Sequence, residues 1–147
     1  MYDIEKSVGF LLAKAYQRAW ALFKEELESY DLTPPQFALM GFLWQQDGLT
    51  QVELSEKSQV DRTTVGGLID RLEKIGLVER HPHPQDRRAY QIRLTTKGKD
   101  MERPLTEVAQ RAMARFTAGL KQEDLGELAR ILEILRGERR VYEKPSC

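Results

Sequence analysis

The chain has 147 residues, a length that fits one domain built around one hydrophobic core. No apolar run is long enough to span a bilayer, and the first residues lack the charged-then-apolar pattern of a secretion signal. We therefore expect a soluble, cytoplasmic protein without membrane contact. The single cysteine, Cys147, excludes an intrachain disulfide bond and any metal site built from several cysteines.

The formal net charge is zero, but the charges are distributed unevenly along the chain. Residues 57–99 contain ten basic and five acidic side chains, a local charge of +5. Residues 1–56 contain four basic and nine acidic side chains, a charge of −5, and residues 100–147 contain nine of each. A basic middle segment favours a polyanionic partner, although an ordinary charged surface can have the same composition.

Residues 4–29 are predicted to form a long amphipathic helix, because apolar side chains recur at three- and four-residue intervals. Little in the adjacent sequence would cover such a long apolar face. We interpret the face as a candidate subunit interface, with packing on its own domain as the alternative. It comprises Val8, Leu11, Leu12, Ala15, Ala19, Leu22, Phe23 and Leu27.

Two helix starts are marked by capping boxes, in which two side chains each accept a hydrogen bond from a free N–H of the first turn. The first box pairs Thr33 with Gln36 and has proline at the first helical position. The second pairs Thr50 with Glu53 and opens a short helix that runs to about Lys57. These patterns predict where both helices begin.

The turn Ser58–Val60 and the N-cap Asp61 lead into a helix over residues 62–75. Two short helices joined by a tight turn are typical of a helix-turn-helix. Inside the second helix, Gly66 and Gly67 each cost about 1 kcal/mol relative to alanine. A close approach to a DNA backbone would explain the two glycines, and so would tight packing on a neighbouring helix.

Two alternating segments, 77–80 and 89–94, predict a two-stranded antiparallel ribbon after the helix-turn-helix. The tip of the ribbon, residues 81–88, is rich in proline and ends in Arg87 and Arg88. A helix followed by a ribbon with arginines at its tip is a shape suited to gripping a nucleic-acid duplex.

The rest of the chain is predicted to be helical up to a short tail. One helix begins near residue 95 and runs to about 119, with a kink or break near Glu102 caused by Pro104. A last helix over about 123–142 carries a second apolar stripe. Residues 143–147 are expected to be disordered.

The helix over residues 62–75 has the features of a major-groove recognition helix. Arginine in its first turns would pair with guanine, and threonine would meet thymine through its methyl group. Helix N-termini bind phosphates, and arginines at a ribbon tip can enter a narrow minor groove. An aspartate beside those arginines is expected to fix one of them by a paired hydrogen bond. The candidate DNA-binding residues are Thr50, Gln51, Arg62, Thr63, Thr64, Gly67, Arg71, Asp86, Arg87 and Arg88.

Signals of catalysis are missing from the sequence. It contains no Gly-rich phosphate loop, no HExxH zinc motif and no GxSxG nucleophile turn. His81 and His83 alternate with prolines in the ribbon tip, where surface turn residues are a simpler interpretation than metal ligands. We predict that the protein is not an enzyme and holds neither cofactor nor metal.

Four segments together resemble one known family. They are LTPPQFALM at 32–40, GLTQVELSEKSQVDRTTV at 48–65, LIDRLEKIGLVER at 68–80 and DRRAYQIRLTTKG at 86–98. The combination resembles the multiple-antibiotic-resistance regulator (MarR) family, and the likeness extends from the first helix to the last.

The resemblance implies a mainly α fold in a single domain. The fold would be a winged helix-turn-helix with a two-stranded β-wing, flanked by long N- and C-terminal dimerisation helices. Residues 32–99 would form the DNA-binding lobe. Residues 1–31 and 100–142 would form the dimerisation helices.

Matching motif positions imply that the recognition helix is 61–75 and the wing 81–88. The family's wing aspartate and arginine fall on Asp86 and Arg88. Many relatives carry polar or basic side chains where Gly66 and Gly67 stand, so base readout is expected to rest more on residues 62–64. Oxidant-sensing relatives use a cysteine in the first helix, which is absent here.

The function that the resemblance implies is that of a homodimeric repressor. It would bind a pseudo-palindromic site on double-stranded DNA and be released by a small ligand, for which aromatic molecules are candidates. Tyr16, Trp20, Phe37 and Met40 could line the ligand pocket, although plain core packing is the more ordinary interpretation of each. A dimeric winged-helix module that binds a protein instead of specific DNA is the alternative function.

Overall fold

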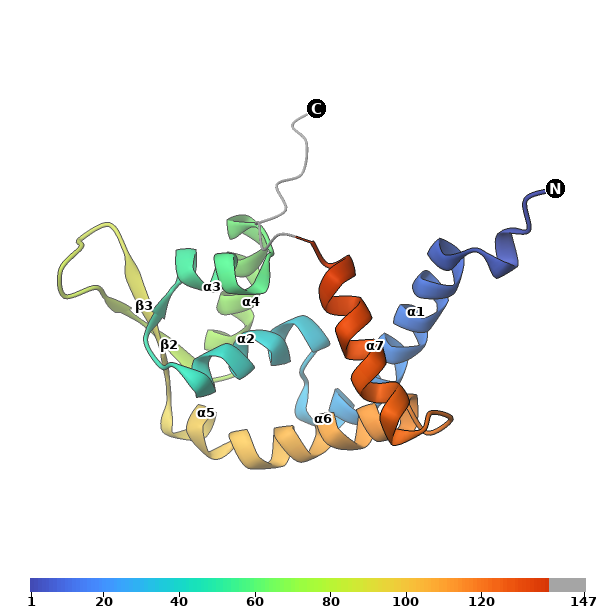
Figure 1. Ribbon diagram of the computed structural model, residues 1–147. Helices are drawn as coiled ribbons and strands as arrows, with labels where there is room; N and C mark the ends of the chain where they lie inside the picture. Colours follow the sequence, from blue (N-terminus) through green and yellow to red (C-terminus); the bar gives the residue numbers. More distant parts are fainter. Residues whose placement is uncertain (138–147) are drawn as a thin grey trace.

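The structure is a computed structural model that describes residues 1–137, and it shows a helical fold with one small sheet (Figure 1). Two 3-10 turns, Ile4–Lys6 and Glu28–Tyr30, flank the first helix. In chain order the other elements are α1 (Val8–Leu27), α2 (Pro34–Gln45), β1 (Leu49–Thr50), α3 (Gln51–Ser58), α4 (Arg62–Lys74), β2 (Val78–Pro82), β3 (Tyr90–Leu94), α5 (Thr96–Asp100), α6 (Glu102–Phe116) and α7 (Gln122–Leu135).

The molecule has two parts that α6 connects. The sheet and α2 to α4 form a lobe at one side of the view, from which the ribbon of β2 and β3 projects (Figure 1). Helix α6 runs from below this lobe to the other side, where α1 and α7 stand (Figure 1).

The predicted helix starts are confirmed. Thr33 and Gln36 form a complete capping box at α2, and Thr50 and Glu53 form another at α3. The side chain of Asp61 caps α4. These starts could be predicted because each depends only on neighbouring residues in the chain.

The sheet has three strands rather than the predicted two. Its order is β1–β3–β2, with Leu49 of β1 opposite Ile92 of β3 and Val78 of β2 opposite Leu94. A strand of two residues is too short to show an alternating pattern, so β1 could not be predicted from periodicity. Its pairing with β3 joins the start of α3 to the ribbon.

The ribbon is longer and its tip is shorter than predicted. His81 and Pro82 belong to β2, whereas the sequence analysis placed them in the turn. Pro82 ends an edge strand, where a residue without an N–H is tolerated. Only residues 83–89 connect the two strands.

The hydrophobic core lies where α2, α4 and the sheet meet the first turns of α6. Three apolar side chains of α4 at three- and four-residue spacing are fully buried. The fully buried side chains of this region include Leu39, Met40 and Leu43 from α2, Val65, Ile69 and Leu72 from α4, Ile92 from β3, and Leu105 and Val108 from α6.

Charged side chains fix α1 along α6. Glu26 accepts a hydrogen bond from Arg115 at 3.2 Å. The hydrogen bond to Glu26, followed by the one to Glu25, raises the pKa of the Arg115 guanidinium. Arg18 donates to the main-chain carbonyl oxygen of Phe116 at 2.9 Å, and it thereby caps the C-terminus of α6.

The terminal helices keep many apolar side chains exposed. Val8 and Tyr16 on α1 are 73% and 64% exposed, and Ile134 on α7 is 65% exposed. We call the exposed aliphatic side chains of α1 and α7, with Leu120 between α6 and α7, the terminal apolar face. It comprises Val8, Leu11, Leu12, Leu120, Leu125, Ile131, Leu132, Ile134 and Leu135.

The predicted break near Pro104 is confirmed. Helix α5 ends at Asp100, Met101 follows, and α6 begins at Glu102. Pro104 lies in the first turn of α6, where a helix needs no N–H from it. The proline thus marks the start of α6 rather than a defect within it.

The last helix is shorter than predicted. It ends at Leu135, and Gly137 has φ +69°, a left-handed conformation that terminates helices. The predicted tail 143–147, with Cys147, and the predicted helical residues 138–142 lie outside the described residues. No helix within the part of the chain that the structure describes is long and apolar enough to cross a membrane.

Candidate nucleic-acid interface

The first turn of α4 presents three exposed polar side chains, Arg62, Thr63 and Thr64. Asp61 organises this turn, because its Oδ1 accepts the backbone N–H of Thr64 at 2.8 Å and its Oδ2 accepts the Thr64 hydroxyl at 2.8 Å. The hydroxyl of Thr64 is therefore used within the turn. Arg62 and Thr63 are the side chains of this turn best able to bind base edges.

The side chain of Gln51 explains one of the two adjacent glycines. Its Nε2 donates to the main-chain oxygen of Arg62 at 3.1 Å, which holds α3 against α4. A Cβ at Gly66 would lie 2.9 Å from this Nε2, whereas a Cβ at Gly67 would meet nothing within 4 Å. Tight packing between α3 and α4 thus explains the glycine at position 66. Nothing within the described chain requires a glycine at position 67.

Two of the predicted DNA contacts, Thr50 and Arg71, also interact within the protein. The hydroxyl of Thr50 accepts the backbone N–H of Glu53 at 3.1 Å, so it stabilises the start of α3. The guanidinium of Arg71 lies 2.6 Å from the carboxylate of Asp31, at the junction between α1 and α2. Both residues stabilise the lobe, and Arg71 lies on the C-terminal half of α4.

The wing tip is shaped by two side chains that accept backbone N–H groups. The Nδ1 of His83 accepts from Gln85 at 3.1 Å and from Asp86 at 3.2 Å. Asp86 Oδ1 accepts the backbone N–H of Arg88 at 3.0 Å, rather than pairing with an arginine side chain as predicted. Arg87 and Arg88 are exposed and form no ion pair with residues 1–137. The tip therefore displays two unpaired cations.

Arg80 fastens the wing to α4, a role that the sequence analysis missed. Its guanidinium lies 2.7 Å from Asp70 and 2.9 Å from Glu73, and it donates to the main-chain oxygen of Gly66 at 3.3 Å. Only 23% of its side chain is exposed. The available signal was a pair of acids three residues apart on a helix, followed by an arginine on the next strand.

The two histidines of the ribbon take part in hydrogen bonds within the ribbon. His81 Nε2 lies 3.0 Å from Glu79 Oε2, and the Nδ1 of His83 accepts from the wing backbone. Within the range that the structure covers, no group of three or more His, Cys, Asp or Glu side chains is placed to hold a metal ion.

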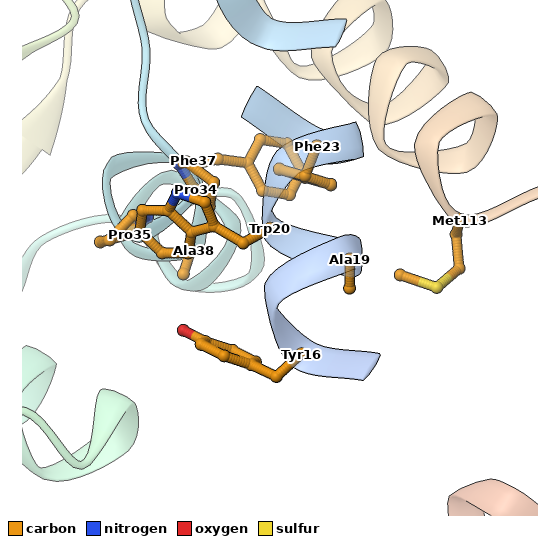
Figure 2. Close-up of a pocket in the computed structure, with 9 residues that line it drawn as sticks. All are labelled: Tyr16, Ala19, Trp20, Phe23, Pro34, Pro35, Phe37, Ala38 and Met113. Carbon is orange, nitrogen blue, oxygen red and sulfur yellow. The ribbon is translucent and has the colours of Figure 1, made fainter. Parts of the chain in front are cut away.

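A second candidate site is a groove of about 330 Å³ between α1 and the start of α2, which we call the α1–α2 groove (Figure 2). Three predicted ligand-binding residues, Tyr16, Trp20 and Phe37, line it. Met40 does not line it, because this side chain is fully buried in the core. Figure 2 shows Met113 pointing from α6 toward Ala19.

Most of the other lining residues were not predicted as ligand contacts. The sequence pattern places Phe23 on an apolar face, and the two prolines predict only the start of a helix. The remaining lining residues are Ala19, Phe23, Pro34, Pro35, Ala38 and Met113.

A capped helix-turn-helix packed on a β-wing with exposed arginines defines the winged-helix class of DNA-binding protein. The MarR family model matches residues 32–90. The transcriptional repressor NicR of Pseudomonas putida is 34% identical over 135 residues, which are 92% of this chain and 84% of NicR. The chain belongs to the MarR family, whose members are non-enzymatic, DNA-binding transcription regulators.

Solved structures agree with this assignment. BpsR of Bordetella bronchiseptica, whose DNA binding is regulated by 6-hydroxynicotinic acid, superposes with a TM-score of 0.88 at 27% identity, over 94% of this chain and 99% of BpsR. A mutant of Escherichia coli MarR in complex with operator DNA gives 0.82 at 28% identity, over 87% and 92% of the two chains. The predicted family and winged helix-turn-helix fold are confirmed.

Proposed function

We propose that the protein is a cytoplasmic, homodimeric transcription repressor that binds a pseudo-palindromic site on double-stranded DNA. A small aromatic molecule in the α1–α2 groove releases it. One observation carries the DNA-binding part: a single lobe combines the exposed first turn of α4 with a wing tip whose arginines have no ion-pair partner in the described chain. The relative NicR is named a transcriptional repressor, which supports repression rather than activation.

In this proposal α4 lies in the major groove and the wing reaches the adjacent minor groove. Arg62 and Thr63 contact base edges, and Gly67 lets the helix approach the duplex closely. Arg87 and Arg88 enter the minor groove, where narrow A·T tracts concentrate negative potential. The neutral total charge is no obstacle, because the basic side chains are concentrated in residues 57–99.

The terminal apolar face supports the dimer. A row of exposed leucines and isoleucines on α7 and on the first half of α1 is more apolar than an isolated surface needs. A two-fold dimer that buries this face would leave both lobes free. Their recognition helices would then meet the same side of the duplex about one helical turn apart, roughly 10 base pairs centre to centre.

The α1–α2 groove supports control by a ligand. It lies where the terminal helices meet the lobe, so an occupant would contact both parts. BpsR, a protein of the same fold, is regulated by the small aromatic molecule 6-hydroxynicotinic acid. Binding at this junction would change the position of the lobe relative to the dimer helices, and with it the spacing of the recognition helices.

The decisive experiment is selection from a random duplex library with the purified protein, followed by binding to the selected site at two salt concentrations. We expect an enriched pseudo-palindrome with half-sites about one turn apart. Arg88→Ala should weaken binding to all sequences and flatten the salt dependence, since one phosphate-neutralising cation is lost. Arg103→Ala, an exposed arginine at the start of α6, is the matched control.

Two results would contradict the proposal. If no sequence is enriched and weak binding disappears in salt, a winged-helix module that binds another protein becomes the better interpretation. If Arg88→Ala and Arg103→Ala behave alike, the wing takes no part in binding DNA.

A further inference from the structure

We infer that the α1–α2 groove selects neutral aromatic molecules and discriminates against aromatic carboxylates. The regulatory meaning of this inference rests on the proposed function, but the binding preference is a separate property of the groove. It would distinguish this protein from BpsR, whose regulator is a carboxylic acid.

The lining of the groove has aromatic faces and no charge. None of the described residues that line it is acidic or basic. The rings of Phe23 and Phe37 lie edge to face with centroids 5.1 Å apart, and those of Tyr16 and Trp20 are 6.2 Å apart. Such surfaces make favourable contacts with the face and edge of a flat ring. They contain no counter-ion for a carboxylate.

The helix end beside the groove has no donors for an anion. A helix N-terminus normally offers free N–H groups that bind carboxylates and phosphates. Here the first two residues of α2 are Pro34 and Pro35, which have no N–H. The next two N–H groups are used, because Gln36 donates to the hydroxyl of Thr33 at 3.5 Å and Phe37 donates to its main-chain oxygen at 3.0 Å.

Two polar side-chain groups remain in the lining, the hydroxyl of Tyr16 and the indole N–H of Trp20. Neither makes a hydrogen bond to another side or main chain of the described protein. Together they can satisfy one carbonyl, hydroxyl or amide group of a ligand. A carboxylate has about four lone-pair sites, so it would lose more hydration than these two neutral groups replace.

The size of the groove also restricts its ligand. The volume of about 330 Å³ is at the small end for ligand sites, which suits a molecule of one or two rings.

The test compares two ligands of one shape and different charge. The neutral probe is 2-naphthamide, and the anion is 2-naphthoate. Their dissociation constants for the full-length protein without DNA are measured by calorimetry. We expect 2-naphthamide to bind at least tenfold more tightly than 2-naphthoate. Equal or tighter binding of 2-naphthoate, or no binding of 2-naphthamide, would overturn the inference.

A substitution in the groove tests whether the preference for the neutral ligand arises there. Met113 lines the groove and is 48% exposed, so Met113→Arg adds a cation at the rim without filling the core. We expect this variant to reduce the preference for 2-naphthamide over 2-naphthoate at least tenfold. Ala114→Arg, on the next residue of α6, which is exposed and lies outside the lining, should leave the preference unchanged. An unchanged preference in Met113→Arg would place the binding elsewhere and overturn the inference.

Release of the selected DNA site is measured separately with the same probes. If 2-naphthamide binds with the expected preference but leaves the DNA complex intact, the inference stands and the proposed release by ligand fails. If 2-naphthoate binds as tightly as 2-naphthamide and both release DNA, the proposed function stands and the inference fails.

Discussion

Gly66 and Gly67 are neighbours in α4, but the structure gives them different surroundings. Gly67 is exposed and a Cβ there would meet nothing within 4 Å. Gly67→Ala should therefore raise the free energy of unfolding by up to about 1 kcal/mol, through helix propensity. The same change should weaken binding of the selected DNA by about tenfold if the helix approaches the duplex at this point. Denaturant unfolding and DNA titration measure the two effects.

Gly66→Ala is the comparison for this prediction. The new methyl group would displace the Gln51 side chain and its hydrogen bond to Arg62, so the gain in propensity is offset and stability stays within about 1 kcal/mol. Wild-type affinity in Gly67→Ala would show that this glycine is not required for DNA binding.

The wing tip depends on one lone pair of His83. His83→Ala removes the acceptor of two backbone N–H groups, so the tip should lose its shape and DNA binding should weaken by about tenfold. His83→Asn is the matched control, because an asparagine oxygen accepts the same kind of backbone N–H in a turn. Equal losses in both variants would mean that the imidazole acts through another contact.

Side-chain partners were the least predictable feature at this scale. Sequence spacing identified Arg87, Arg88 and Arg62 as candidate cations, and all three are exposed. It could not show that Arg71 reaches Asp31, because these residues are 40 positions apart and meet only through the fold. The fully buried position of Met40 agrees with core packing, the more ordinary interpretation of this residue, and not with the ligand contact.

At the scale of elements, Arg80 joins the wing to α4. Arg80→Met should lower the free energy of unfolding by about 1–3 kcal/mol, because Asp70 and Glu73 lose a hydrogen-bonded partner. Hydrogen exchange in β2 should increase at the same time. Arg93→Met, on the exposed side of β3, should change stability by less than about 0.5 kcal/mol. Equal effects of the two substitutions would contradict this role of Arg80.

Gly98 lets α5 approach the start of the wing. A Cβ at this position would lie 2.1 Å from the main-chain oxygen of Leu77, and the main-chain oxygen of Gly98 accepts the indole N–H of Trp44 at 2.9 Å. Gly98→Ala should cost about 3 kcal/mol or more, because backbone must move. Gly41→Ala in α2 meets nothing within 4 Å and should be neutral or slightly stabilising in the same unfolding assay.

Elements that depend on neighbouring residues were predicted from the sequence, whereas elements that depend on distant contacts were not. Capping boxes, the N-cap of α4 and the break at Pro104 were predicted, because residues within one turn determine them. Strand β1 was missed because its two residues become a strand only through pairing with β3. The end of α7 was placed too late, since apolar spacing continues past Leu135 while the backbone turns at Gly137.

At the scale of the whole molecule, the terminal apolar face should control assembly. Ile134→Glu places a charge on this face at a side chain that is 65% exposed, so the folded subunit should tolerate it. We expect a monomer in light scattering, with DNA affinity at least about tenfold lower because each half-site is bound alone. Gln122→Glu, at the first residue of α7 and outside the face, is the control. A dimeric Ile134→Glu would show that other residues hold the subunits together.

The small strand β1 limits how such a protein can be switched. Thr50 is at once the N-cap of α3 and the partner of Gln91 in the sheet, while Arg80 holds the base of the wing to α4. The recognition helix and the wing are therefore held together as one rigid unit, so their relative position is hard to change. In the proposed ligand-controlled dimer, an effector would instead change the distance between the two lobes. Release from DNA should then appear as a change in half-site spacing, while each lobe keeps its structure.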